Sequence, residues 1–266
     1  MELLKYEFFR NALIGIVIVS LISAVIGTYI VTRRMVFISG GITHACFGGL
    51  GMGYWLGVSP LATAALFAVG GALGVDWLSR RSVRKDSAIA VIWALGMALG
   101  ILFIFLTSGY VPELNTFLFG NVLTITVPDL WIFGGFTAVA LLLFGLMHRA
   151  VIAVSFDEDF ARTRHLPVRV VNTLMTVLVA VSIVLTIRMI GIMLLMSLMS
   201  LPQMTAELYT RRYGTLLGWS ALISLAGCIG GLTAAYYLGV PASAAIVLLL
   251  VLLYGLGALL RRLRGA

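Results

Sequence analysis

The sequence predicts an all-α fold, a polytopic transmembrane helical bundle of about eight or nine spans. Hydrophobic residues make up 61% of the chain and charged residues only 11%, whereas an average soluble domain has about 25% charged residues. So few charges cannot cover a surface exposed to water, so lipid must contact most of the exterior. With little chain left for a soluble unit, residues 1–266 are expected to form a single transmembrane domain.

The apolar segments can be placed in order, because a span needs roughly 20 apolar residues. They are 12–31, 42–57, 61–78, 88–107, 130–147, 170–188, 190–207, 215–238 and 243–260. Segment 42–57 is the shortest and is rich in glycine. A broken or re-entrant element is therefore one interpretation of it.

Basic residues gather in pairs at the ends of these segments, as the positive-inside rule describes for cytoplasmic loops. The pairs are Arg33–Arg34, Arg80–Arg81, Arg84–Lys85, Arg211–Arg212 and Arg261–Arg262. If the first pair is cytoplasmic, the N-terminus lies outside, and every other pair, the loop 148–169 and the C-terminus fall in the cytoplasm. The net charge of +8 then reflects topology, and no nucleic-acid partner is expected. The predicted location is the cytoplasmic (inner) membrane, with multiple crossings.

The stretch 155–169 reads as a short helix on the cytoplasmic face. Ser155 can cap it, and three carboxylates in its first turn favour the positive end of the helix dipole. Arginines lie toward its other end, where Pro167 closes it. The charged residues concerned are Asp157, Glu158, Asp159, Arg162 and Arg164. The residues alone leave two interpretations open, a solvated linker and a docking element for a cytosolic partner.

His44 is the one histidine placed within a predicted span, because His148 and His165 fall on the cytoplasmic side. An ionisable group within a span is a functional candidate by default, and imidazole binds many metal ions. Thr43 is a weaker oxygen donor beside it. A stable metal site needs about three or four donors. His44 is therefore either a residue lining a path, a buried hydrogen-bonded histidine or an interfacial side chain.

Four methionines in 189–199 are spaced so that a continuous helix would align them in one stripe. They are Met189, Met193, Met196 and Met199. Thioethers suit soft ions such as Cu(I), but methionine also fills irregular gaps between helices. Both interpretations of the stripe stay open, with packing as the simpler one.

The sequence contains no recognisable catalytic machinery. Cys46 and Cys228 lie in apolar runs and form no CxxC motif. No nucleophile–base pair, HExxH motif or phosphate-binding GxxxxGK[ST] loop occurs. The chain is therefore not expected to be an enzyme or to bind a permanent cofactor.

Five stretches of the chain carry a family resemblance. They read RRMVFISGGITHA at 33–45, LFGNVL at 118–123, FDEDFARTRHL at 156–166, GIMLLMSLMSLPQMTA at 191–206, followed by TRR at 210–212, and PASAAIV at 241–247. In this order they resemble motifs of permeases in the ABC-3 family, the membrane subunits of zinc, manganese and iron importers. The resemblance covers nearly the whole chain.

The resemblance implies an importer of two permease copies and two cytosolic ATPase subunits, fed by an external solute-binding protein. A divalent metal, zinc or manganese by default, would be the cargo, and the partner subunit would hydrolyse ATP. The loop 148–169 would hold the coupling helix. The docking residues implied in this way are Phe156, Asp157, Glu158, Phe160, Ala161 and Arg162. His165 stands where the family usually has glycine.

The metal-ligand pattern of the family is incomplete in this chain. Where the family has an aspartate one helical turn before the histidine, this sequence has Gly40 or Gly41, and Gly239 replaces a second frequent aspartate. The loss favours an alternative cargo such as a metal chelate. A stand-alone secondary transporter or channel is a further alternative. Such carriers usually place paired ionisable residues at the midplane, which these spans lack.

Overall fold

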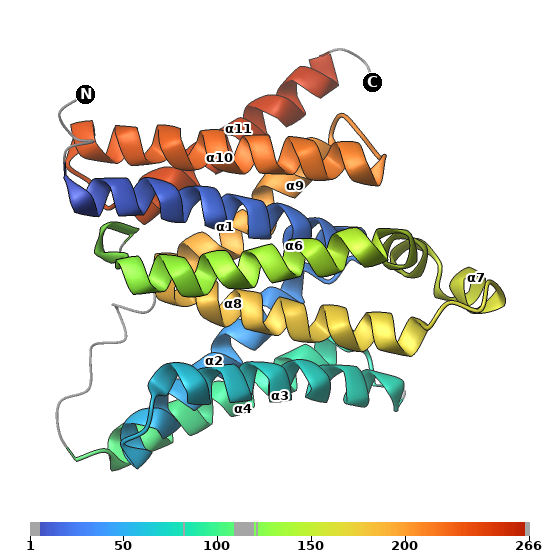
Figure 1. Cartoon of the computed structure of the whole chain (residues 1–266), viewed down its shortest axis with the longest axis horizontal. Coiled ribbons are helices and arrows are strands. Elements are labelled where there is room, and N and C mark those ends of the chain that lie inside the picture. The colour runs from blue at the N-terminus through green and yellow to red at the C-terminus, as the bar shows by residue number, and fades with distance from the viewer. Residues whose placement is uncertain (1–5, 82, 109–119, 121, 264–266) are drawn as a thin grey trace.

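The computed structural model describes residues 6–81, 83–108, 120 and 122–263. Every regular element in these ranges is helical, which confirms the predicted all-α class, and eight candidate spans are long and apolar enough to cross a membrane. The helices are α1 (Glu7–Thr32), α2 (Val36–Leu56), α3 (Pro60–Arg80), α4 (Lys85–Leu106), η2 (Val122–Thr124), α6 (Val127–Phe156), α7 (Glu158–Thr163), α8 (Val168–Leu198), α9 (Leu201–Glu207), α10 (Tyr213–Leu238) and α11 (Ala242–Leu263). Figure 1 shows the long helices lying side by side as a bundle.

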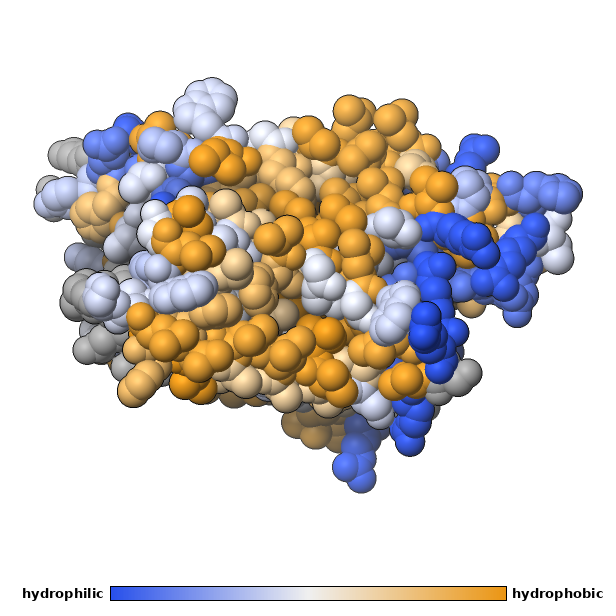
Figure 2. All heavy atoms as spheres, turned by 90° about the horizontal axis from the view of Figure 1, so that it is seen from below, coloured by the Kyte–Doolittle hydropathy of each residue, from blue (hydrophilic) through white to orange (hydrophobic). Residues whose placement is uncertain are grey.

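The centre of the bundle is formed by α1, α2 and the α8–α9 segment. Within their most apolar windows, 78%, 78% and 72% of the residues are buried, against 17% for α4 and for α6. The outer helices therefore turn most of their side chains outward, where lipid can solvate apolar groups. Figure 2 shows this hydrophobic band, with the larger group of hydrophilic side chains at one end of the molecule and a smaller group at the other.

The hydrophilic end is called here the basic end. It carries the α1–α2 junction, the α3–α4 junction, α7 and the α9–α10 junction, whose charged residues line two neighbouring cavities. The other end, called the opposite end, carries the start of α6, where Thr126 and Asp129 form a capping box. The charge pairs predicted to share one side of the membrane thus lie together in space.

Helix α8 breaks sharply at Gly191, whose φ of 78° and ψ of 170° are not helical. The candidate span Val168–Glu207 has 40 residues, and a straight helix of that length would measure about 60 Å, twice the hydrocarbon core of about 30 Å. Instead the chain turns back at the opposite end (Figure 1). There Arg188 contacts Asp129, whereas Glu207 lines a cavity at the basic end. The predicted segments 170–188 and 190–207 are the two arms of this turn.

The break is packed against a second glycine from the segment before α6. Gly120 has a φ of 57°, and a side chain on it would collide with the backbone of Ile190 and Gly191. Two stretches of the family pattern therefore meet at the opposite end. Residues 118, 119 and 121 of the LFGNVL stretch lie outside the described residues.

The interpretation of 42–57 as a broken or re-entrant element is wrong, because α2 is a continuous helix that starts six residues earlier, at Val36. Its glycines serve close packing. A β-carbon on Gly51 would lie 2.6 Å from the carbonyl oxygen of Gly100 on α4, and one on Gly53 would lie 2.6 Å from the α-carbon of Pro60 on α3. Such small residues let membrane helices approach where the hydrophobic effect gives no drive.

Candidate metal path and coupling surface

His44 is held between two residues of the neighbouring helix α4. Its ring stacks on the indole of Trp93, with centroids 4.2 Å apart and planes 12° apart. Its Nδ1 lies 3.3 Å from the sulfur of Met97. His44 is half-buried and, because α2 begins at Val36, lies about 12 Å along the helix from its first residue.

The structure does not bring Thr43 to this cluster. Its side chain is fully buried, and its hydroxyl donates a 2.6 Å hydrogen bond to the carbonyl oxygen of Ser39 in the preceding turn. Successive residues on a helix point about 100° apart. Thr43 therefore points away from the ring of His44.

Gly40 lies four residues before His44 and Gly41 three, and their surroundings differ. A β-carbon on Gly40 would lie 3.1 Å from the methyl carbon of Met196 and 3.4 Å from the ring of Trp93, whereas one on Gly41 would press on Ile89. In the place where the family pattern has a carboxylate, this chain thus has a thioether and an indole nearby.

No carboxylate set converges on His44. Among the described residues, no group of three or more His, Cys, Asp or Glu side chains could hold a metal ion. Gly239, the other glycine at a frequent aspartate position, ends α10 at the opposite end with a φ of 66°. That left-handed conformation is favourable for glycine at a helix C-terminus.

The four methionines do not form the predicted continuous stripe, because Gly191 reverses the chain after the first of them. Met189 and Met199 are buried, so these two side chains fill space between helices. Met193 is 38% exposed, and Met196 alone lies beside the His44 face of α2. The predicted stripe requires an unbroken helix, and Gly191 breaks that helix.

The short helix predicted in 155–169 is present as α7, with a different cap. Ser155 still belongs to α6 and donates to the carbonyl oxygen of Val151. Asp157 is the N-cap, and its carboxylate accepts hydrogen bonds from the backbone N–H groups of Asp159 and Phe160 at 3.0 and 2.9 Å. His165 follows with a φ of 55°, so the turn where the family usually has glycine is kept.

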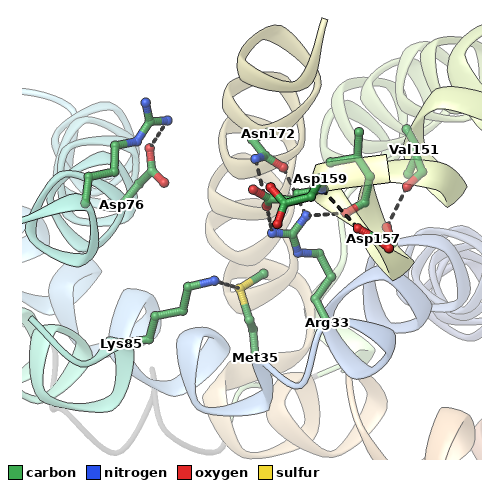
Figure 3. Close-up of polar contacts among 12 residues, drawn as sticks. Arg33, Met35, Asp76, Lys85, Val151, Asp157, Asp159 and Asn172 are labelled. Atoms are coloured by element: carbon green, nitrogen blue, oxygen red, sulfur yellow. Dashed lines mark hydrogen bonds and ion pairs between the residues drawn. The ribbon is translucent and has the colours of Figure 1, made fainter. Parts of the chain in front are cut away.

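Glu158 on α7 binds Arg33. The sequence indicated Arg33 only as one of the basic residues that mark the cytoplasmic side. Arg33, with a side chain only 10% exposed, forms an ion pair with Glu158. It also donates to the carbonyl oxygen of Val154 and to Asn172 Oδ1, both at 3.0 Å. Asn172 in turn donates to Glu158 at 3.1 Å. Figure 3 shows Arg33 reaching from the α1–α2 junction toward Asn172 on α8.

The network keeps Glu158 ionised. Burial raises the pKa of its carboxyl group, but the hydrogen bonds from Arg33 and Asn172 and the charge of Arg33 outweigh burial, so that the pKa falls below its ordinary value. The carboxylate therefore binds Arg33 at neutral pH, and protonation in acid would weaken that contact.

The six implied docking residues divide into two groups. Phe156 and Phe160 are 62% and 55% exposed and present aromatic surface. Arg162 is also exposed and pairs with Asp159 at 3.4 Å. Ala161 is fully buried, while the carboxylates of Asp157 and Glu158 bind within the molecule. The two rings thus supply the exposed apolar surface of this group.

A charged cavity of about 370 Å³ opens behind α7. Its lining comes from the α1–α2 junction, α3, α4, α7 and α8, and includes Arg33, Asp76, Lys85, Glu158, Arg169 and Asn172. It adjoins a second cavity of about 780 Å³ that Arg33, Glu158 and Glu207 also line. The Arg33–Glu158 pair therefore stands between two water-accessible spaces at the basic end.

Comparison with known proteins agrees with this architecture. Residues 5–261 match the ABC 3 transport family. An uncharacterized membrane protein of Synechocystis is 35% identical over 98% of this chain and 93% of its own length. The manganese transport system membrane protein MntC of Halalkalibacterium halodurans is 31% identical, over 96% and 88%.

Two solved structures share the fold. PsaBC from Streptococcus pneumoniae, in complex with Fab, superposes with a TM-score of 0.85 at 27% identity and covers 96% of this chain and 92% of its own. An inward-facing putative metal-chelate type ABC transporter superposes with a TM-score of 0.76 at 17% identity, covering 97% and 87%, and supports the fold alone. From the helix arrangement and the match along nearly its entire length, the chain belongs to the ABC 3 transport family.

Proposed function

We propose that this chain is the permease subunit of an ATP-driven importer that passes a metal ion across the cytoplasmic membrane, with manganese or zinc as the default cargo. Family membership supports the permease role, and the name of the Halalkalibacterium relative supports the metal. The observation that carries the proposal is the half-buried Arg33–Glu158 pair, which connects an exposed helix to the start of the helix that bears His44.

Coupling would proceed through that connection. A partner ATPase contacts the exposed rings of Phe156 and Phe160 and moves α7. Glu158 transfers the movement to Arg33, which stands three residues before the first residue of α2. Helices move as rigid elements, so a shift at the start of α2 is carried to His44. The chain itself supplies no phosphate-binding loop, and the partner would hydrolyse ATP.

The remaining parts of the assembly follow from family membership. The basic end faces the cytoplasm in this proposal, as the positive-inside rule favours, and the C-terminus lies there. A second permease copy completes the path, and a solute-binding protein delivers the cargo at the opposite end. Docking by α7 and delivery at the other end place the two partners on different sides of the bilayer.

A test separates docking from transmission. Phe160→Ala should lower the amount of ATPase that co-purifies with the tagged chain, because it removes exposed aromatic surface. Arg33→Ala should leave co-purification intact but lower uptake of radiolabelled manganese or zinc at least about fivefold, the low end of typical coupling free energies. Asp86→Asn is the matched control. The Asp86 side chain is 74% exposed, and its ion pair with Arg84 is loose, with the charged atoms 4.0 Å apart. Full uptake by both Arg33→Ala and Phe160→Ala would overturn the coupling route.

A metal chelate is the second candidate cargo. The absence of a carboxylate set around His44 in the described part of the chain favours it. A chelate hides the charge of the ion, so the path need not supply anionic ligands. Uptake of labelled metal that requires a chelator in the medium would select this candidate over the free ion.

A further inference from the structure

The cluster at His44 lacks the aspartate of the family pattern, because Gly40 stands one helical turn before the histidine. It offers an imidazole nitrogen and a thioether sulfur 3.3 Å apart, from His44 and Met97. A second thioether, that of Met196, reaches the adjoining turn of α2 and ends 3.1 Å from a β-carbon built on Gly40. All three donors are neutral.

The separation of the first two donors suits one bound ion. Metal bonds of about 2.0 Å to nitrogen and about 2.3 Å to sulfur, at a tetrahedral angle, place the two ligand atoms roughly 3.5 Å apart. The observed 3.3 Å between His44 Nδ1 and Met97 Sδ is close to that value. Because Met196 is unbranched and has three rotatable side-chain bonds, its sulfur can turn toward the same ion.

Charge decides which ion such a site can hold. Transfer of an ion out of water costs free energy in proportion to the square of its charge, so a monovalent ion costs about a quarter as much as a divalent one. A divalent ion here would have no anionic ligand to offset that cost. Thioether ligands moreover select soft ions such as Cu(I), and imidazole also suits copper, whereas Mn²⁺ prefers carboxylate and carbonyl oxygen.

We propose that His44, Met97 and Met196 form a binding site for a soft monovalent cation, Cu(I) or its redox-inert analogue Ag(I). Trp93, stacked on the imidazole at 4.2 Å, lies against one face of the His44 ring. The site keeps the proposed permease role but replaces manganese or zinc, the default cargo, with a soft monovalent ion. The soft-ion proposal rests on the permease role only where it treats the ion as cargo. Binding of the ion to the site needs no partner protein.

The test is a binding measurement on the purified full-length chain in detergent under anaerobic conditions. Cu(I) is offered in competition with a chromophoric chelator, and Ag(I), Mn²⁺ and Zn²⁺ are titrated separately while tryptophan fluorescence is recorded. We expect Cu(I) and Ag(I) to bind and to quench Trp93. His44→Ala and Met97→Leu should each weaken binding by roughly 10- to 100-fold or more, the loss that follows even from removal of an outer-shell partner. Met147→Leu, on α6, is the matched control and should bind like the unmodified chain.

A second measurement avoids dependence on variants that fold poorly. X-ray absorption of the Cu(I)-loaded, unmodified protein should show both sulfur and imidazole neighbours of the metal. A spectrum with nitrogen and oxygen neighbours alone, or Met97→Leu binding Cu(I) as tightly as the unmodified chain, would overturn the site. Neither result bears on co-purification with an ATPase, so failure of the soft site and failure of the permease role are distinguishable.

Discussion

At the scale of single residues, the chemistry of this chain is decided by which side chain faces His44. One turn before it, Gly40 leaves room that a thioether and an indole occupy, whereas a carboxylate there would supply a hard anionic donor. One residue therefore separates two classes of ligand set on an otherwise unchanged helix. The neighbouring Thr43 and Gly41 point elsewhere and take no part in this choice.

Gly40→Asp is predicted to change the preference of the site from soft to hard ions. An aspartate there adds a negative oxygen donor beside His44, and the nearest atom to its β-carbon is the flexible end of Met196, 3.1 Å away. We expect Mn²⁺ to bind roughly tenfold more tightly, a change of about 1.4 kcal/mol, and Cu(I) to lose its advantage. The measurement is the same competition titration. Gly40→Asn is the control for shape without charge, and equal Mn²⁺ binding by both variants would contradict the electrostatic argument.

At the scale of elements, the break in α8 determines where every later residue lies. Gly191 adopts a φ of 78° and a ψ of 170°, a region open almost only to glycine. The reversal sends Met196 back into the bundle beside α2 and brings α9 to the basic end. A helix without the break would place these residues outside any bilayer of ordinary thickness.

Gly191→Ala is predicted to destabilise the protein by about 1–3 kcal/mol, the usual cost of a residue held in a disfavoured backbone conformation. Thermal unfolding in detergent measures the effect as a lowered midpoint temperature. Gly70→Ala is the matched control, because Gly70 lies within α3 with open space around its α-carbon. That change should be neutral or stabilising, since alanine favours helix over glycine. A midpoint unchanged in Gly191→Ala would mean that the break does not depend on glycine.

At the scale of the whole molecule, the clustering of charge gives an orientation that can be measured. Both native cysteines are buried, so a membrane-impermeant maleimide should react only with an introduced thiol. Asp159→Cys replaces a side chain that is 92% exposed at the basic end, and Val58→Cys replaces one that is 50% exposed at the opposite end.

We expect intact cells to label Val58→Cys and to leave Asp159→Cys unlabelled, because the positive-inside rule places the basic end in the cytoplasm. Inside-out vesicles should give the reverse pattern. Labelling of Asp159→Cys in intact cells would put α7 outside, where no ATPase could reach it, and would remove the basis of the coupling proposal.

The fold was predictable to a large extent, and the candidate site only in part. Hydropathy places the spans because a bilayer requires each of them to be long and apolar, and the acidic residues of 157–159 indicate α7 because they favour a helix start. His44 stands out because an ionisable residue in a span is costly. Nothing in the local sequence marks Trp93 or Met97 as its neighbours, since that pairing depends on how closely the glycines of α2 let α4 approach.

By itself the sequence determined that this protein is a helical membrane protein with its positive charge gathered on one side. These properties follow from composition and from the order of residues along single segments, and they need no knowledge of contacts. The tertiary structure alone decided that Glu158 pairs with Arg33, and that Met196 meets the face of His44. Both are contacts between segments more than a hundred residues apart, and such contacts depend on helix packing and on the reversal at Gly191.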